Sequence, residues 1–206
     1  MSAVSASAVA PVAAASAAVD PLAAALVTVR AHTAADPAVV SGRGLEALIA
    51  GVGVGAPRKA WILPGRRERA VAVVRGCTAD RLDEARPFRV VPPGDSPAAR
   101  ALYAVGLALS GDPAVVFVGT GTAGYGAFHE ALQLAAAHAA PVTFVVAWYA
   151  NPGPFAAPLA VAPSVLAAAL GFATAVVDGT DAAAVRDAVA AADGQTLIEA
   201  RLVGRG

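Results

Sequence analysis

The stretch of residues 114–151, AVVFVGTGTAGYGAFHEALQLAAAHAAPVTFVVAWYAN, decides the fold of this chain. It opens with an apolar, β-branched run at 114–118 and continues into a Gly-rich turn. Apolar residues then recur at helical spacing, and a second apolar run follows at 142–146. This order is typical of a βαβ unit, in which a backbone-exposing turn follows the first strand. Because α/β folds place phosphate groups at such turns, the function depends on the side chains that fill this one.

Length and composition limit the class of protein. The 206 residues suffice for one domain with a substantial core, which we place at 19–206. The net charge is zero, so no basic surface indicates nucleic acid and no polybasic tail indicates a membrane. The apolar residues come in short blocks that are too brief to span a bilayer.

Two smaller features concern the compartment. Residues 1–18 form a low-complexity Ala/Ser/Val segment without basic residues before its apolar part. This composition favours a disordered or loosely helical arm over a secretory signal, and therefore a cytoplasmic protein. Cys77 is the only cysteine, which excludes a disulfide framework and a thiolate metal cluster. We expect it to be a small buried apolar side chain.

Outside the central unit, helices and strands are predicted to alternate. Helices are expected at 20–31, 44–50, 66–75, 96–109, 164–171 and 182–192, and strands at 60–63, 174–177 and 196–203. The glycines of 51–55 are expected to end the second helix, and Ser96 is expected to cap the fourth. The strands are apolar on both faces. The predicted fold class is therefore α/β, a three-layer, doubly wound parallel sheet with helices on both faces.

The Gly-rich turn permits more than one interpretation. Gly119, Gly121 and Gly124 match the G-x-G-x-x-G spacing of dinucleotide-binding turns. Such a site also needs an acidic residue near the end of the next strand, where it binds a ribose hydroxyl. That strand ends in Ala-Trp-Tyr at 147–149, so no carboxylate is available there. The glycines could instead serve only to let strand and helix pack closely. A nucleotide-binding α/β domain is kept as an alternative function.

The chain resembles the alpha subunit of the thiamine diphosphate-dependent 2-oxo acid dehydrogenases, of the pyruvate and branched-chain type. The resemblance rests on GAFHEAL at 126–132, PVTFVV at 141–146, VDGTD at 177–181 and TLIEA at 196–200. GLEA at 44–47 and PGRRER at 64–69 extend it toward the N-terminus. It implies the diphosphate-binding module of the thiamine diphosphate-binding fold, with an active site formed together with a beta-type subunit.

The same resemblance shows where this chain departs from the family. There, a magnesium ion bridges the cofactor's diphosphate to an aspartate, an asparagine and a backbone carbonyl. The aspartate position is Thr120 here, the asparagine pair is Trp148 and Tyr149, and the carbonyl position is Asn151. Magnesium prefers oxygen ligands with a carboxylate among them, so the resemblance implies no metal site in this chain. A metal held by Thr120 and the Asn151 side chain is the alternative.

The family's diphosphate-contacting Tyr-Arg pair is altered as well. Arg67 keeps the arginine, Arg66 replaces the tyrosine, and Arg69 replaces a histidine two residues on. On one short helix, these arginines could bind a phosphate or a partner's carboxylate, or could form a solvated face.

Bulky aromatic side chains, Tyr125, Trp148 and Tyr149, are expected to fill the cofactor cavity. His129 corresponds to a structural histidine of the family, so no catalytic residue is expected. The degenerate cofactor-binding set implied by the resemblance is Gly119, Thr120, Gly121, Tyr149, Asn151 and Arg67.

Two functional hypotheses follow from the resemblance. In the first, the chain is a degenerate alpha-type subunit, a pseudoenzyme that binds no magnesium or thiamine diphosphate by itself. It would be a structural or regulatory partner of a beta-type subunit, or of a second copy of itself. In the alternative, altered ligands hold thiamine diphosphate and magnesium, and the enzyme decarboxylates a 2-oxo acid with acyl transfer to an acceptor.

Overall fold

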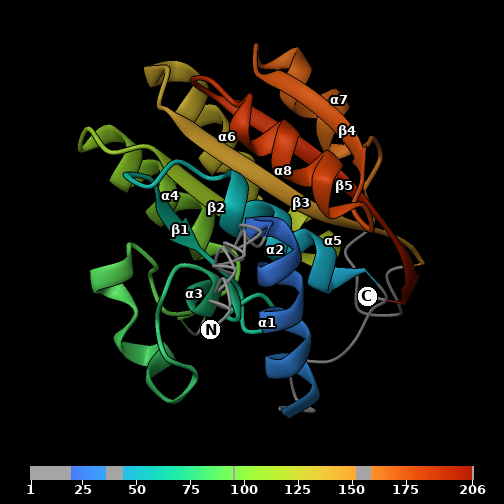
Figure 1. Cartoon of the computed structure of the whole chain (residues 1–206). Coiled ribbons are helices and arrows are strands. Elements are labelled where there is room, and N and C mark those ends of the chain that lie inside the picture. The colour runs from blue at the N-terminus through green and yellow to red at the C-terminus, as the bar shows by residue number, and fades with distance from the viewer. Residues whose placement is uncertain (1–19, 36–43, 95, 152–158, 206) are drawn as a thin grey trace, which may run out of the picture.

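A parallel sheet forms the centre of the molecule (Figure 1). The computed structural model describes residues 20–35, 44–94, 96–151 and 159–205, so the arm predicted at 1–18 lies outside the described residues. The strands pair in the order β1-β2-β3-β5-β4, and every pair is parallel. They are β1 (Trp61–Leu63), β2 (Ala114–Gly119), β3 (Val142–Asn151), β4 (Ala173–Asp178) and β5 (Thr196–Arg205).

Helices cover both faces of this sheet, as right-handed connections between parallel strands require. From β1 through β2 and β3 to β4, the chain moves in one direction across the sheet. From β4 to β5 it moves back in the opposite direction. One face carries α4 (Ala99–Leu109), α6 (Gly126–His138) and α7 (Pro163–Ala169). The other carries α1 (Pro21–Ala35), α2 (Leu45–Gly55), α3 (Val71–Val74) and α8 (Ala182–Ala190). Because of this reversal, the helix between β4 and β5 lies on the opposite face from α4, α6 and α7.

The sheet divides the core in two, because alternate residues of a strand point to opposite faces. In β2, Val115 and Phe117 pack on the α2–α8 side, and Val116 and Val118 pack on the α4–α6 side. All four side chains are at most 3% exposed. The prediction of a doubly wound parallel sheet with apolar central strands is therefore confirmed.

Short helical segments complete the described elements: η1 (Ala79–Glu84), η2 (Arg86–Phe88) and α5 (Thr120–Ala123). The predicted cap is present in part, since the Ala99 N–H donates to Ser96 Oγ at 3.3 Å. β3 runs beyond its predicted end at 146 because its second half pairs with β5 as far as Asn151. No helix within the described residues has both the length and the apolar composition needed to cross a membrane.

The glycine run at 51–55 does not end α2, contrary to the prediction. The helix continues through Gly55 because its glycines face another helix at close range. A Cβ on Gly51 would lie 2.7 Å from Val185 Cβ, and one on Gly55 would lie 2.5 Å from Arg186 O. Both neighbours belong to α8. The glycines thus allow close packing of two helices rather than a turn.

The helix predicted over 66–75 is also wrong in its first half. After β1 the chain makes turns closed by main-chain hydrogen bonds between residues three positions apart, such as the bond from Val71 N–H to Glu68 O at 3.0 Å. Only α3 is α-helical. Glu68 is buried despite its charge, whereas Arg66 and Arg67 are exposed. The arginines therefore sit on a turn that is fixed by a buried carboxylate.

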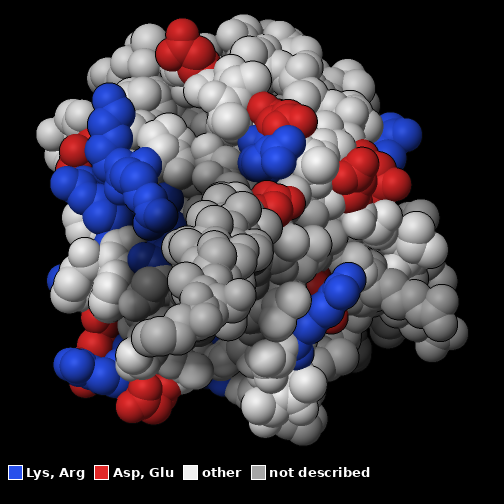
Figure 2. All heavy atoms as spheres, viewed as in Figure 1, with Lys and Arg blue, Asp and Glu red and all other residues white. Residues whose placement is uncertain are grey.

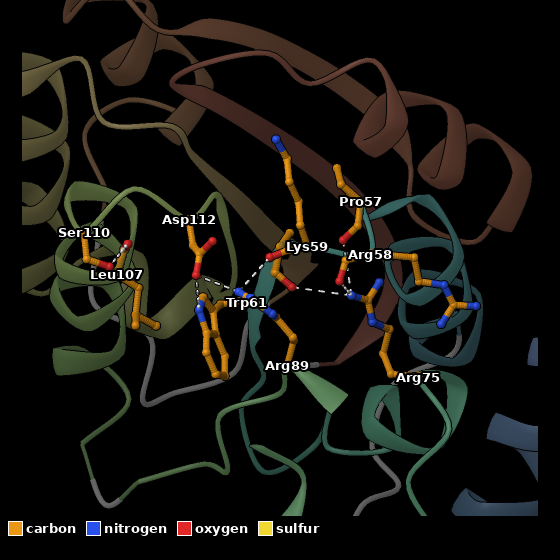
Figure 3. A network of polar contacts seen from close by, with 10 residues as sticks. Pro57, Arg58, Lys59, Trp61, Arg75, Arg89, Leu107, Ser110 and Asp112 are labelled. Atoms are coloured by element: carbon orange, nitrogen blue, oxygen red, sulfur yellow. Dashed lines mark hydrogen bonds and ion pairs between the residues drawn. The ribbon is translucent and has the colours of Figure 1, made fainter. Parts of the chain in front are cut away.

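Arg75 fixes the loop that precedes β1, at the amino edge of the sheet (Figure 3). Its buried guanidinium donates to carbonyl oxygens of the loop 56–60 at 2.9–3.4 Å. Beside this loop, Arg89 lies 5.0 Å from the centre of the Trp61 ring and pairs with Asp112 at 2.6 Å. Basic side chains gather on this side of the molecule, at the left of Figure 2.

We expect Gly51→Ala to destabilise the fold, because the new methyl group would collide with Val185 across the contact between α2 and α8. Overpacking of this kind lowers the free energy of unfolding by about 1–3 kcal/mol. Urea denaturation measures the change. Gly106→Ala on α4 is the matched control: its Cβ would meet nothing within 4 Å, and it should stabilise the helix by about 0.5–1 kcal/mol. Equal effects of the two substitutions would contradict the close packing.

Candidate functional site

The candidate residues lie at the carboxyl edge of the sheet, where α/β folds bind their ligands. The register Gly119↔Ala147 places the end of β2 beside β3, and α5 starts directly after Gly119. Tyr149 and Asn151 lie in the last part of β3. Arg67 follows β1 in an exposed turn. The structure therefore brings segments from three neighbouring strands to one edge.

Thr120 joins β2 to β3 through both functions of its hydroxyl group. Its Oγ1 donates a hydrogen bond to Ala147 O at 2.8 Å and accepts one from Tyr149 N at 2.9 Å. The residue is 5% exposed. A hydroxyl has one proton, and Thr120 uses it here. The Thr120 hydroxyl, at the position expected for the metal ligand, thus links the end of β2 to the main chain of β3.

The prediction that Tyr125, Trp148 and Tyr149 together fill one cavity is wrong. Trp148 and Tyr149 are neighbours in β3, and neighbouring residues of a strand point to opposite faces. Tyr149 is 4% exposed and belongs to the core on the α2 side. Trp148 packs against the core on the α4–α6 side. Tyr125 is 55% exposed. Of the three, only Tyr149 is fully buried.

The hydroxyl of Tyr149 is buried and has no hydrogen-bond partner among the described residues. Burial raises the pKa of this phenol, the charges of Glu68 and Glu46 raise it further, and Arg67 opposes them. Tyr149 is therefore a neutral phenol at neutral pH. The same electrostatic effects show that Arg67, from the turn after β1, lies in its neighbourhood.

A buried pair of opposite charges, Glu68 and Arg100, lies at the same edge and was missed by the sequence analysis. The two residues are 9% and 7% exposed. They meet over Gly65, where an added Cβ would collide with Glu68 Oε2 and lie 3.1 Å from Arg100 Nη2. Burial raises the pKa of Glu68, and the Arg100 charge opposes that shift. One signal was available: Arg100 shares a helix face with the buried Ala104 and Ala108.

The Gly-rich turn contains no backbone conformation that requires glycine. Gly119 has φ −79° and Gly124 has φ −85°, and Gly121 lies inside α5. A Cβ on Gly119 would meet nothing within 4 Å. The interpretation that this glycine only brings strand and helix together is therefore wrong, and space remains open beside the end of β2.

Other candidate ligands are few at this edge. In the described part of the chain, no group of three or more His, Cys, Asp and Glu side chains could hold a metal ion. The backbone of Asn151 pairs with Arg205 at the end of β3. His129 Nε2 lies 3.1 Å from Ala123 O and ties α6 to α5, which is a structural contact. Cys77 is buried, as expected, and burial raises the pKa of its thiol.

Comparison with known proteins agrees with the resemblance seen in the sequence. Residues 99–199, from α4 to β5, match the model of the family "Dehydrogenase E1 component". No curated protein matches the chain. A solved structure of a proposed thiamin diphosphate-dependent enzyme isolated from Mycobacterium smegmatis is similar with a TM-score of 0.55 and 20% identity. The match covers 80% of this chain and 32% of that one, so this chain spans about a third of its length. The stretch from α4 to β5 is thus similar to the dehydrogenase E1 component, and the chain has the fold of a thiamin diphosphate-dependent enzyme.

Proposed function

We propose that this chain is a degenerate alpha-type subunit of a 2-oxo acid dehydrogenase-like enzyme, which acts as the structural or regulatory partner of a beta-type subunit. In this proposal it does not hold magnesium and thiamine diphosphate in the manner of its family. The observation that carries the proposal is the hydroxyl of Thr120, which stands at the metal-ligand position and is committed to Ala147 and Tyr149.

The donor set at the carboxyl edge fits magnesium poorly. Magnesium dehydrates reluctantly and takes carboxylates and other oxygen ligands in a strict octahedral arrangement. Thr120 offers a neutral hydroxyl whose proton points at a carbonyl oxygen. Tyr149 offers a neutral phenol that is buried in the core. Neither group supplies the negative charge that a divalent cation next to a diphosphate requires.

The charges around the site also oppose a diphosphate. Arg100, a buried cation at this edge, lies near the opposite charge of Glu68, on the other side of the space over Gly65. A diphosphate near Gly65 would approach the Glu68 carboxylate, and like charges in a buried place repel strongly. The charge of Arg100 is therefore offset inside the protein by Glu68, which supports a structural role for Arg100.

One observation favours the alternative of an active enzyme with altered ligands. Gly119 borders open space, and Arg67 is exposed near Tyr149, so an anion could still approach this edge. In that case thiamine diphosphate would supply the decarboxylation chemistry and Arg67 would hold its diphosphate. The first experiment below separates the two proposals.

A partner subunit is proposed because the family that the chain resembles forms its active site between an alpha-type and a beta-type subunit. In this proposal the beta-type subunit associates with the chain in the cytoplasm. Large apolar side chains are exposed and available for such a contact, among them Tyr103 and Tyr125.

The first experiment is native mass spectrometry of the complex purified from its source cells. We expect no mass of thiamine diphosphate or magnesium on the chain, because in this proposal Thr120 and Tyr149 replace the magnesium ligands of the family. Thermal denaturation of the same complex should show no rise in melting temperature with the cofactor and magnesium present, since a ligand that does not bind the native state cannot stabilise it.

Variants give this experiment its controls. Thr120→Asp combined with Tyr149→Asn restores the family's ligand types, and a magnesium-dependent rise in the melting temperature of this variant would show that the assay detects binding. Binding to the unaltered chain at one cofactor per site, lost in Arg67→Ala, would overturn the proposal and establish the alternative.

We expect Arg100→Met to destabilise the protein more at neutral than at acid pH. The substitution leaves the Glu68 carboxylate buried without its partner, which costs about 3–5 kcal/mol. The pKa of Glu68 is raised in the fold, so the native state binds more protons than the unfolded state above the ordinary pKa of 4.5. The free energy of unfolding therefore falls as pH rises from that value through the raised pKa, and falls further in the variant. Urea denaturation across this range measures it.

The double variant Glu68→Gln with Arg100→Met is the control for this pH dependence. It removes both charges, so its free energy of unfolding should change little with pH over the same range. Parallel pH curves for the single variant and the unaltered protein would show that Arg100 does not neutralise Glu68.

A further inference from the structure

β4 is the last strand at one side of the sheet, and its outer side pairs with no other strand among the described residues. Its inner side pairs with β5 without a register shift. The Ala173 N–H donates to Gln195 O at 3.1 Å, and the Gly179 N–H donates to Arg201 O at 2.8 Å. Because main-chain direction alternates along a strand, Thr174, Val176 and Asp178 direct their N–H and C=O groups outward.

In the part of the chain that the structure describes, β4 lacks several of the features by which proteins usually protect an outer strand. Lysine, proline, a bulge or a covering segment normally prevents pairing with another chain. β4 reads ATAVVD, so it contains neither lysine nor proline, and its pairing with β5 is regular. Val176 is 49% exposed at its middle. The strand is therefore ready to accept another strand.

We propose that two copies of this chain associate by antiparallel pairing of their β4 strands, about a two-fold axis at Val176. The inference does not depend on the proposed function, because it concerns a different edge of the sheet from the one that carries Thr120.

The strand is self-complementary in this register. Val176 lies opposite Val176 of the second copy, and Thr174 lies opposite Asp178 of the second copy. The three residues that face outward thus meet each other, and each of these pairs can exchange two main-chain hydrogen bonds. A two-fold axis gives both copies the same contacts. A shift by one residue would instead oppose outward-facing groups to groups that already bind β5.

The side chains agree with the same register. Thr174, Val176 and Asp178 share one face of the strand and are all exposed. Asp178 Oδ1 already accepts hydrogen bonds from the Thr180 N–H at 2.8 Å and the Thr180 hydroxyl at 2.7 Å. Its second oxygen can accept from the Thr174 hydroxyl of the other copy. Val176 meets its own counterpart, which adds an apolar contact between two polar pairs.

Apolar surface beside β4 would enlarge this interface. α7 lies next to β4 in Figure 1 and packs on it. Val165 on α7 is 58% exposed, and Val161 just before it is 49% exposed. A stable dimer buries about 800 Å² on each partner, which is more than a short strand provides alone. Contacts from α7 on the same side would supply the remainder.

The test begins with the mass of the full-length protein in solution. Light scattering behind size-exclusion chromatography should give a dimer, and Val176→Lys should raise its dissociation constant at least tenfold, because two lysines would then lie directly opposite each other. Val27→Lys is the matched control: Val27 is 67% exposed on α1, so this substitution should leave the dimer unchanged.

Cross-linking tests the register without relying on a disruptive change. Paired residues that exchange hydrogen bonds lie about 5.5 Å apart between Cα atoms, within the range of a disulfide. Val176→Cys should therefore form a covalent dimer on mild oxidation, whereas Val27→Cys should not. The native Cys77 is buried and gives little background.

A monomer at every protein concentration, or a complex with another chain that holds one copy of this one, would overturn the proposal. A dimer that survives Val176→Lys and forms no Val176→Cys cross-link would overturn it as well, because its interface would then lie elsewhere. Neither result depends on cofactor binding, so failure here is distinguishable from failure of the proposed function.

Discussion

Burial of both faces of the central strands is the constraint on which the rest of the structure depends. Val115 and Phe117 enter one half of the core, and Val116 and Val118 enter the other, so neither face of β2 can be left to water. Helices must therefore cover both faces. On one of these faces α2 and α8 also pack directly on each other, which glycines make possible. Because every strand pair in this arrangement is parallel, the carboxyl ends of the strands lie at the same edge of the sheet.

The fold class could be predicted because it rests on local patterns. Apolar strand segments alternate along the sequence with segments of helical periodicity. A chain with this alternation can bury its apolar residues in few folds other than a parallel sheet with helices on both sides. The errors arose where one signal has two physical meanings. Glycines end a helix, but they also allow two helices to approach, and only the position of α8 shows which applies to Gly51 and Gly55. The turn after β1 depends on the burial of Glu68, which no local pattern reveals.

The candidate site could be predicted in position but only in part in its chemistry. Thr120 and Tyr149 come together because one follows β2 directly and the other lies in the last part of β3, the neighbouring strand in the sheet. Their hydrogen bonds could not be foreseen, since a threonine hydroxyl has many possible partners within reach. The pair of Glu68 and Arg100 joins segments far apart in the sequence, and such pairs are not visible to an analysis of local spacing. Trp148 was misplaced although the two-residue period of a strand would have separated it from Tyr149.

The double use of the Thr120 hydroxyl has a consequence for how this sequence can change over evolutionary time. An ionised carboxylate accepts hydrogen bonds but cannot donate one, so an aspartate at 120 would leave Ala147 O without its donor. A buried carbonyl without a partner costs about 1–3 kcal/mol, a substantial part of the stability of a domain. Any mutational path to an acidic residue at this position therefore passes through a less stable protein, unless a compensating change precedes it. The loss of stability on substitution therefore favours retention of threonine at position 120.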